Sequence, residues 1–227
     1  MPPAAAALPP GRWQVVLPVK GGPRAKSRLE PLTGALPGLA LALALDCLDA
    51  VLGASAVARA WVVTADPEVA ARAAAQGAAV APERRPGAGL LAAVADGVAA
   101  AGGSGGPVAV LLADLPSLRP SDLDAALAAA ERALAAGAGE VLVPDAEGTG
   151  TVLLAAASAL ELRPRFGPGS AAAHAADGAL AVGLDLPRLR RDADTPAELA
   201  EALALGAGPR TTALAGPAAH QGGRAAC

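Results

Sequence analysis

Residues 107–118, PVAVLLADLPSL, contain an unbroken apolar run that ends at a carboxylate. The run from Val108 to Ala113 does not alternate with polar residues, which is typical of a strand buried on both faces of a parallel sheet. Asp114 follows at the carboxyl end of the expected strand, where open α/β sheets collect ligands. Asp114 is therefore a candidate contact for a metal or a substrate, and its alternative role is that of a cap or turn residue.

Strand-like and helix-like patterns alternate along the chain. Short runs of bulky or β-branched residues predict strands at 13–19, 61–64, 78–81, 108–113, 140–143 and 180–184. Longer patterns predict helices at 36–52, 67–76, 90–101, 122–136, 171–175 and 196–203. The expected helix N-caps are Asp66, Ser121, Ser170 and Thr195. This alternation favours one α/β domain with a mostly parallel, mixed sheet and helices on both faces.

The two ends of the chain differ from this middle in composition. Residues 1–11 are expected to form a flexible N-terminal extension, because their prolines oppose a helix. Residues 12–205 are expected to form the folded domain. Residues 206–227, rich in Gly, Ala and Pro, are expected to form a disordered C-terminal tail.

The composition argues against several kinds of partner. A net charge of −3, one Phe, two Trp and no Tyr give neither the basic surface nor the stacking aromatics of a nucleic-acid-binding protein. Cys47 and Cys227 form no metal-binding or disulfide framework, so a cytoplasmic location fits best. The apolar stretch 36–52 is interrupted by two Asp residues and predicts a buried helix, not a membrane span. An apolar chain of this kind can form a homodimer, but no heptad or patch identifies an interface.

A cationic, glycine-bearing loop follows the first expected strand. Its four positive residues are Lys20, Arg24, Lys26 and Arg28. Glycines allow backbone N–H groups to approach a ligand, and this many cations can neutralise a triphosphate. A solvated basic turn is the alternative interpretation. The loop is not a Walker A motif, because Ala25 stands where that pattern needs Gly, and it is not the G-x-G-x-x-G fingerprint.

Two further loops combine glycine with hydroxyl residues. Residues 144–156, PDAEGTGTVLLAA, contain Thr149 and Thr151, and this loop is either an anion site or a turn between two strands. In residues 165–174, RFGPGSAAAH, a glycine loop leads to Ser170 at the start of a short helix, an arrangement that can hold an anion. His174 can assist at this anion site, although a lone His is more often structural than catalytic.

Two acids precede the last well-defined helix, in RRDADTPAEL. Asp192 and Asp194 alternate with Ala193 in extended chain, so both side chains are expected to project to one side. Two carboxylates aimed at one place repel unless a cation lies between them. With Asp114 they can supply oxygen ligands to Mg²⁺, which prefers carboxylates, waters and phosphates. The alternative is a helix cap for Asp194 and a surface acid for Asp192.

Six motifs occur here in an order that resembles the 2-phospholactate guanylyltransferase family, which includes the phosphoenolpyruvate guanylyltransferases of coenzyme F-420 biosynthesis. They are LPVKGGPRAKSRL, VVTADPEV, LLADLPSL, PDAEGTGTVLLAA, RFGPGSAAAH and RRDADTPAEL. The resemblance extends from Trp13 to about Leu203. It implies a nucleotide-diphospho-sugar transferase-like, Rossmann-like fold, so that 12–205 is expected to be a nucleotidyltransferase domain. It also implies a GTP substrate, Mg²⁺ and a phosphorylated three-carbon acid as acceptor.

The resemblance also implies residue roles, motif by motif. The expected metal ligands are Asp114, Asp192 and Asp194. The expected contacts to phosphoenolpyruvate are Thr151, Gly167 and Ser170, with Thr149 as a near neighbour of the first. The expected contacts to GTP are Pro18, Lys20, Lys26 and Gly89, and the expected catalytic residues are Asp114, Lys20, Lys26 and Arg28. The chain departs from the family at Leu91, where Asn is frequent, and this departure bears on base selectivity.

The reaction that the resemblance implies is transfer of GMP from GTP to phosphoenolpyruvate, with loss of diphosphate. The product, enolpyruvoyl-2-diphospho-5'-guanosine, then passes to a downstream transferase that carries a deazaflavin acceptor. Alternatives within the fold are 2-phospho-L-lactate or 3-phosphoglycerate as acceptor, or a molybdenum-cofactor or sugar-phosphate nucleotidyltransferase. An alternative of another class is a catalytically silent α/β partner protein.

Overall fold

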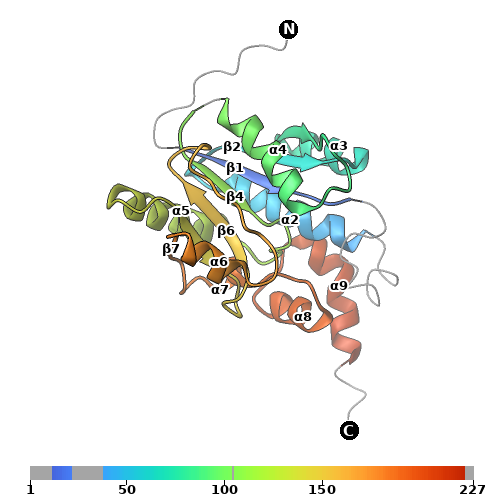
Figure 1. The fold of residues 1–227 in the computed structure, drawn as a ribbon. Helices are drawn as coiled ribbons and strands as arrows, with labels where there is room; N and C mark the ends of the chain where they lie inside the picture. The colour runs from blue at the N-terminus through green and yellow to red at the C-terminus, as the bar shows by residue number, and fades with distance from the viewer. Residues whose placement is uncertain (1–11, 22–37, 104, 223–227) are drawn as a thin grey trace.

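The computed structural model describes residues 12–21, 38–103 and 105–222. The flexible extension expected at 1–11 lies outside the described residues, and so do Arg24, Lys26 and Arg28 of the basic loop. Within the described part, one central sheet organises the other elements (Figure 1).

The sheet has seven strands in the order β3-β2-β1-β4-β6-β5-β7. The strands are β1 (Trp13–Pro18), β2 (Val57–Thr64), β3 (Ala79–Pro82), β4 (Val108–Leu111), β5 (Val141–Pro144), β6 (Thr151–Ala156) and β7 (Leu180–Ala181). β1, β2, β3 and β4 pair in parallel, and so do β5 and β7. β6 runs antiparallel to both of its neighbours, β4 and β5. The expected mostly parallel, mixed α/β sheet is therefore confirmed.

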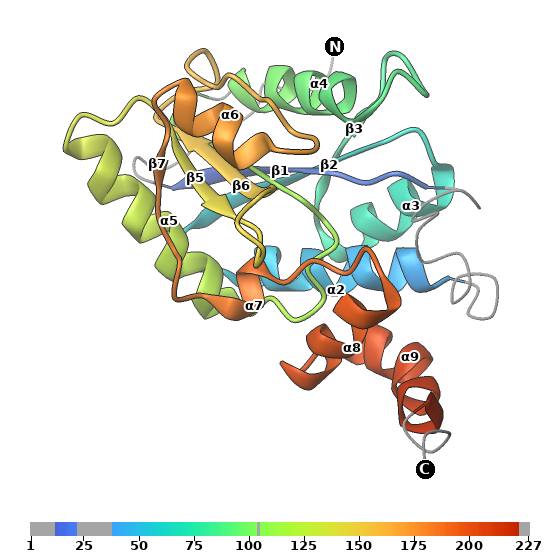
Figure 2. The same cartoon turned by 60° about the horizontal axis from the view of Figure 1, so that its bottom comes forward.

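Helices cover both faces of the sheet, as Figure 2 shows with the sheet seen between two helical layers. On one side lie α2 (Leu39–Gly53), α3 (Pro67–Gln76) and α5 (Pro120–Ala135). On the other side lie α4 (Leu90–Gly102) and α6 (Ser170–Ala176). The short helix α7 (Pro187–Arg190) and the helices α8 (Pro196–Ala204) and α9 (Pro209–Gly222) complete the described chain.

Each face of the sheet has its own apolar core. Alternate residues of β1 separate the two: Val15 and Leu17 pack with α2 and α5, whereas Val16 packs with α4. The four residues of β4 are all buried, which confirms the strand expected to be covered on both faces. Gly97 of α4 lies so close to Val16 that a Cβ there would overlap the valine side chain, which brings α4 directly onto the sheet.

Two predicted helix caps are confirmed and two are wrong. The Asp66 carboxylate accepts hydrogen bonds from two backbone N–H groups of α3, and Thr195 forms a capping box with Glu198. Ser121 does not cap α5, because the helix already begins at Pro120, a residue suited to the first helical position. Ser170 is likewise inside α6, and Gly169 precedes it with a positive φ of 72° that suits a residue without a Cβ.

The expectation of a disordered tail is wrong for residues 206–222. α9 packs against α2, and its Thr211 and Ala215 are buried. The buried Asp46 carboxylate of α2 accepts hydrogen bonds from the backbone N–H groups of Arg210 (3.2 Å) and Thr211 (2.7 Å), and from the Arg210 guanidinium (3.1 Å). A carboxylate from a helix distant in sequence therefore accepts the N–H groups at the start of α9, which have no partner within the helix. The Gly- and Pro-rich composition of the tail does not indicate this partner.

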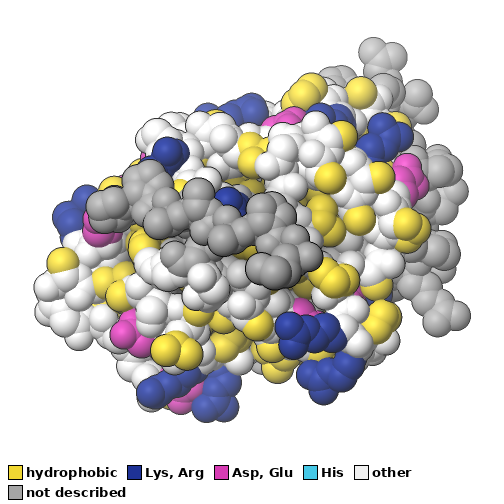
Figure 3. Space-filling view, turned by 90° about the horizontal axis from the view of Figure 1, so that it is seen from above, with side chains coloured by type: hydrophobic (Ala, Val, Ile, Leu, Met, Phe, Trp, Pro, Cys, Tyr) yellow, Lys and Arg dark blue, Asp and Glu magenta, His cyan; other side chains and the backbone are white. Residues whose placement is uncertain are grey.

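In the part of the chain that the structure describes, the surface carries no single block of positive charge on the face seen in Figure 3. On the face in Figure 3, Lys and Arg side chains stand in separate small groups, with apolar side chains scattered between them. Among the residues described, no helix combines the length and the apolar character that crossing a membrane requires.

The contact between Asp46 and α9 gives a test of how the C-terminal helix is held. Asp46→Ala removes a carboxylate that receives three hydrogen bonds, so we expect the free energy of unfolding to fall by about 2–3 kcal/mol. Urea denaturation measures this change. The control is Asp49→Ala, since Asp49 contacts the same arginine from a half-exposed position and should cost under about 1 kcal/mol. Equal losses in the two variants would contradict the capping role of Asp46.

Candidate active site

Three carboxylates meet at the end of β4. Asp114 follows that strand, whereas Asp192 and Asp194 lie between α7 and α8. One oxygen from each residue lies within 4.8 Å of the other two, and all three side chains are partly buried. The structure thus brings together the three acids that the sequence analysis named as expected metal ligands.

Ala193 explains why both of its neighbours face Asp114. Its backbone N–H donates to the Asp114 carbonyl at 3.0 Å, and its side chain is fully buried against α2 and α8. With Ala193 turned into the core, the alternation of extended chain directs Asp192 and Asp194 toward the acid of β4. Three carboxylate oxygens at this spacing form a donor set that fits a hard divalent cation.

The acids open onto a cleft of about 680 Å³. Eight of the expected site residues line it: Pro18, Lys20, Asp114, Thr151, Gly167, Ser170, Asp192 and Asp194. Gly89 is not part of the lining, although the next residue, Leu90, is. Leu91, the position that departs from the family pattern, is about half exposed and also lies outside the lining. Lys26 and Arg28 are outside the described residues.

The direction of β6 brings the hydroxyl loop to the acids. β6 is antiparallel to β4, and Leu111 pairs with Leu153. Thr151, the first residue of β6, therefore lies at the edge of the sheet where β4 ends. A parallel strand would have placed Thr151 at the opposite edge.

The loop between β5 and β6 is held by its own acid. The Asp145 carboxylate accepts hydrogen bonds from the backbone N–H groups of Thr149 (2.8 Å) and Gly150 (2.7 Å). A Cβ at Gly150 would overlap this carboxylate, so the position needs glycine. The stretch is a turn between two strands, and its hydroxyl residues Thr149 and Thr151 also line the cleft.

Thr149 and Thr151 differ in their surroundings. Thr149 is exposed, and its carbonyl accepts the backbone N–H of Ala171 at 3.1 Å, which joins this loop to α6. Thr151 is buried, and its Oγ1 lies 2.9 Å from Nδ1 of His174. His174 is itself fully buried, and burial lowers the pKa of its imidazole. His174 is therefore a buried residue that contacts Thr151, a residue of the cleft.

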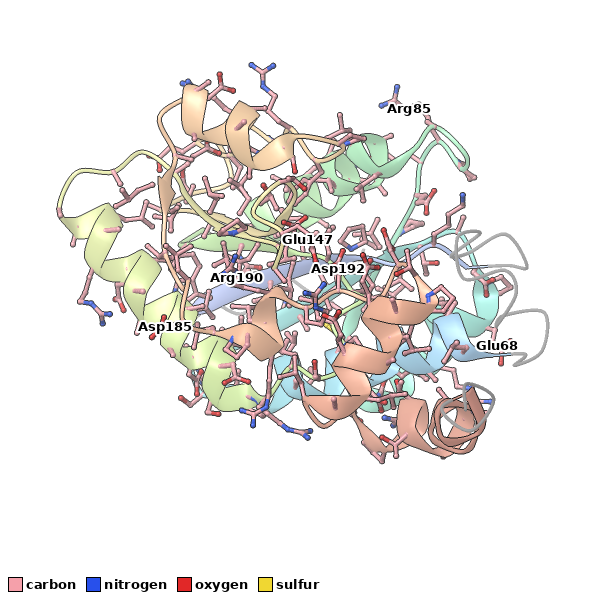
Figure 4. All side chains as sticks on the ribbon, turned by 90° about the horizontal axis from the view of Figure 1, so that it is seen from below. Glu68, Arg85, Glu147, Asp185, Arg190 and Asp192 are labelled. Carbon is pink, nitrogen blue, oxygen red and sulfur yellow. The ribbon has the colours of Figure 1, made fainter. Side chains whose placement is uncertain are left out.

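Sequence reasoning missed Arg190 and Arg191, which join the acid segment to the β5–β6 loop. Arg190 donates to the backbone carbonyls of Pro144 (3.1 Å), Asp145 (2.7 Å) and Leu184 (2.8 Å). Arg191 pairs with Glu147 at 2.6 Å, and this hydrogen bond lowers the pKa of the Glu147 carboxyl. Figure 4 shows Glu147, Arg190 and Asp192 together in the middle of the view, whereas Glu68 and Arg85 lie toward its edge.

The arginine pair in RRDAD is a sequence signal for contacts of this segment. Two arginines directly before two acids offer either an ion pair or a tether, and the motif does not say which. The structure separates the roles, because Arg190 binds carbonyls and Arg191 binds carboxylates.

The tether predicts that Arg190 controls the mobility of the β5–β6 loop. Arg190→Met keeps the apolar stem but removes every donor, so we expect faster amide exchange across residues 145–150 and a loss of about 2 kcal/mol in unfolding free energy. Hydrogen exchange with mass spectrometry measures the first effect. Arg188→Met is the matched control, since Arg188 is exposed and donates to a single carbonyl. Unchanged exchange in Arg190→Met would show that the loop is held without it.

Comparison with known proteins gives the family. The model of the MobA-like NTP transferase domain matches residues 41–172. A phosphoenolpyruvate guanylyltransferase from Salinispora arenicola is 54% identical over 217 residues, which cover 93% of this chain and 97% of the relative. One from Streptomyces coelicolor is 47% identical and covers 90% of this chain and 96% of the relative.

A solved structure agrees on the fold. A nucleotidyl transferase from Methanothermobacter superposes with a TM-score of 0.61 at 19% identity, covering 82% of this chain and 94% of that chain. At this identity the likeness concerns the fold alone, which is the nucleotidyltransferase fold expected from the sequence. The relatives over nearly the full length confirm the resemblance seen in the motifs, and this chain belongs to the phosphoenolpyruvate guanylyltransferase family of nucleotidyltransferases.

Proposed function

We propose that this chain transfers GMP from GTP to phosphoenolpyruvate and releases diphosphate. One observation carries the proposal: three converging carboxylates open onto the same cleft as Lys20, Thr151 and Ser170. The cleft thus combines a cation site with groups suited to anions, as the joining of two phosphorylated substrates requires. The 54% identity to a protein named phosphoenolpyruvate guanylyltransferase supports these two substrates.

The acids are assigned to magnesium. Asp114, Asp192 and Asp194 would hold Mg²⁺, because a hard cation prefers carboxylate oxygens and the cluster brings three of them together. When bound, the ion would supply positive charge that offsets the repulsion between two anionic substrates. Asp145 is not assigned to the metal, since its carboxylate is already engaged by two backbone N–H groups of its own loop.

The GTP side of the cleft is assigned to the end of β1. Pro18 and Lys20 line the cleft, and Lys20 is exposed, so its ammonium is free to approach phosphate oxygens. Gly21 lies so close to the Asp66 side chain that a Cβ there would overlap it, and this contact fixes where the basic loop leaves the sheet. Lys26, Arg28 and Gly89 keep the GTP roles that the family resemblance implies.

The acceptor is assigned to Thr151, Gly167 and Ser170. A phosphate oxygen of phosphoenolpyruvate attacks the α-phosphorus of GTP, a new P–O bond forms, and the bond between the α-phosphorus and the bridging oxygen breaks. The electron pair of that bond leaves with diphosphate. The attacking oxygen is already anionic, so no protein base is needed, and positioning with charge neutralisation is the work of the protein. This chain would act in the cytoplasm, where the product, enolpyruvoyl-2-diphospho-5'-guanosine, is handed to a downstream transferase of coenzyme F-420 biosynthesis that adds the deazaflavin acceptor.

The choice of acceptor can be tested by diphosphate release. With GTP and Mg²⁺, we expect diphosphate release to depend on phosphoenolpyruvate, and to be slower with 2-phospho-L-lactate or 3-phosphoglycerate. A coupled diphosphate assay, run with and without the downstream transferase, measures this. If no acid supports release while GTP still binds, the proposal fails and another nucleotidyltransferase reaction takes its place.

The metal-binding role of the carboxylates can be tested by substitution of Asp114. Asp114→Asn removes a charge from the proposed metal site, so we expect the turnover rate to fall at least about 100-fold and the Mg²⁺ requirement to rise. Asp185→Asn is the control, because Asp185 is exposed and stands apart from Asp192 in Figure 4. A rate for Asp114→Asn within a few-fold of the parent, at saturating Mg²⁺, would remove Asp114 from the metal site.

A further inference from the structure

The protonation of His174 is fixed by the backbone beside it. The N–H of Arg165 donates to Nε2 of His174 at 2.8 Å. A backbone N–H can only donate, so Nε2 must be the unprotonated acceptor. A neutral imidazole carries one ring proton, and here that proton is on Nδ1.

This tautomer determines how Thr151 uses its hydroxyl. Nδ1 of His174 lies 2.9 Å from the Thr151 Oγ1 and donates its proton to that oxygen. The hydroxyl hydrogen of Thr151 is therefore not directed at His174. In the described part of the chain, His174 is the one hydrogen-bond partner recorded for this hydroxyl, and Thr151 lines the cleft.

The buried setting of His174 favours the neutral form of the ring. The ring is fully buried and meets Phe166 edge-on at 5.5 Å between centroids. Burial lowers the pKa of the imidazole, and so does Arg165, whereas Asp177 and the Ser170 carbonyl act in the opposite direction. Gly150, which precedes Thr151, is fixed by Asp145, so the threonine is restrained from both sides.

We propose that His174 is a positioning residue, which makes the Thr151 hydroxyl a hydrogen-bond donor to an anionic oxygen of the acceptor. The proposal rests on the proposed function. A threonine hydroxyl can donate or accept, but the oxygens of a phosphate or carboxylate only accept. By occupying a lone pair of Oγ1, His174 leaves the hydroxyl proton for the substrate and selects for an anion in this part of the cleft.

Two substitutions at position 174 separate the two hydrogen bonds of the ring. Asn places its amide where Nδ1 stood, so His174→Asn keeps a donor to Thr151. Gln reaches the position of Nε2, so His174→Gln keeps the acceptor for Arg165 but loses the donor. We expect His174→Gln to raise the KM for phosphoenolpyruvate about tenfold and His174→Asn to stay within about threefold, because a hydrogen bond to a charged group is at stake.

A double-mutant cycle tests whether His174 acts through the threonine. We expect Thr151→Val to raise the KM for phosphoenolpyruvate roughly ten- to a hundredfold, and His174→Gln to add nothing in that background. The KM for GTP should stay constant, which assigns the bound oxygen to the acceptor. Equal effects of His174→Gln in both backgrounds would reduce His174 to a structural residue and overturn the proposal. A rise confined to GTP would overturn the assignment to the acceptor.

The tautomer is tested without catalysis. Two-bond ¹H–¹⁵N spectra of the parent chain at pH 7 should show a neutral ring protonated on Nδ1, with signals that disappear in His174→Asn. A ring protonated on Nε2 would overturn the proposal even if the enzyme is active. If the parent chain releases no diphosphate with phosphoenolpyruvate, the proposed function fails and the acceptor role of Thr151 fails with it, while the spectrum still decides the bond between His174 and Thr151.

Discussion

Three carboxylates approach one another closely at the end of β4, and their mutual repulsion has to be offset by the segments around them. Like charges at this separation repel, so the segment that carries Asp192 and Asp194 has to be held by groups other than the acids. The hydrogen bond from Ala193 to Asp114, the burial of the alanine side chain and the ion pairs of Arg191 with two glutamates do this. The cleft therefore contains a preformed cluster of negative charge, which favours the binding of a cation.

The antiparallel strand β6 makes a substrate site around this point. Because β6 runs antiparallel to β4, its first residue, Thr151, lies at the edge of the sheet where the acids lie. Arg190 then bonds the carbonyls of the β5–β6 loop to the acid segment. The segment that carries the acids and the loop that leads to the hydroxyl are thus linked by hydrogen bonds from the Arg190 side chain to backbone carbonyls.

Much of the fold could be predicted because its signals are local. The apolar run before Asp114, the cap at Asp66 and the capping box at Thr195 each identify an element from neighbouring residues. Ser121 and Ser170 misled the prediction, since a proline and a glycine beside them set the helix starts. The order of the motifs named eight residues that line one cleft, whereas the contacts of Arg190 and His174 join segments that are distant in sequence and could not be predicted.

The sequence alone is enough to identify the alternating α/β pattern, the strand that ends at Asp114 and the family, because hydrophobic period and short motifs are properties of neighbouring residues. The helix α9 depends on a tertiary contact, since its first N–H groups, those of Arg210 and Thr211, donate to Asp46, which is 164 and 165 positions away in the sequence. The tautomer of His174 likewise depends on tertiary contacts, because it is set by a backbone N–H nine positions earlier and by a hydroxyl on strand β6. Hydrogen bonds act over about 3 Å in space and do not depend on separation along the chain.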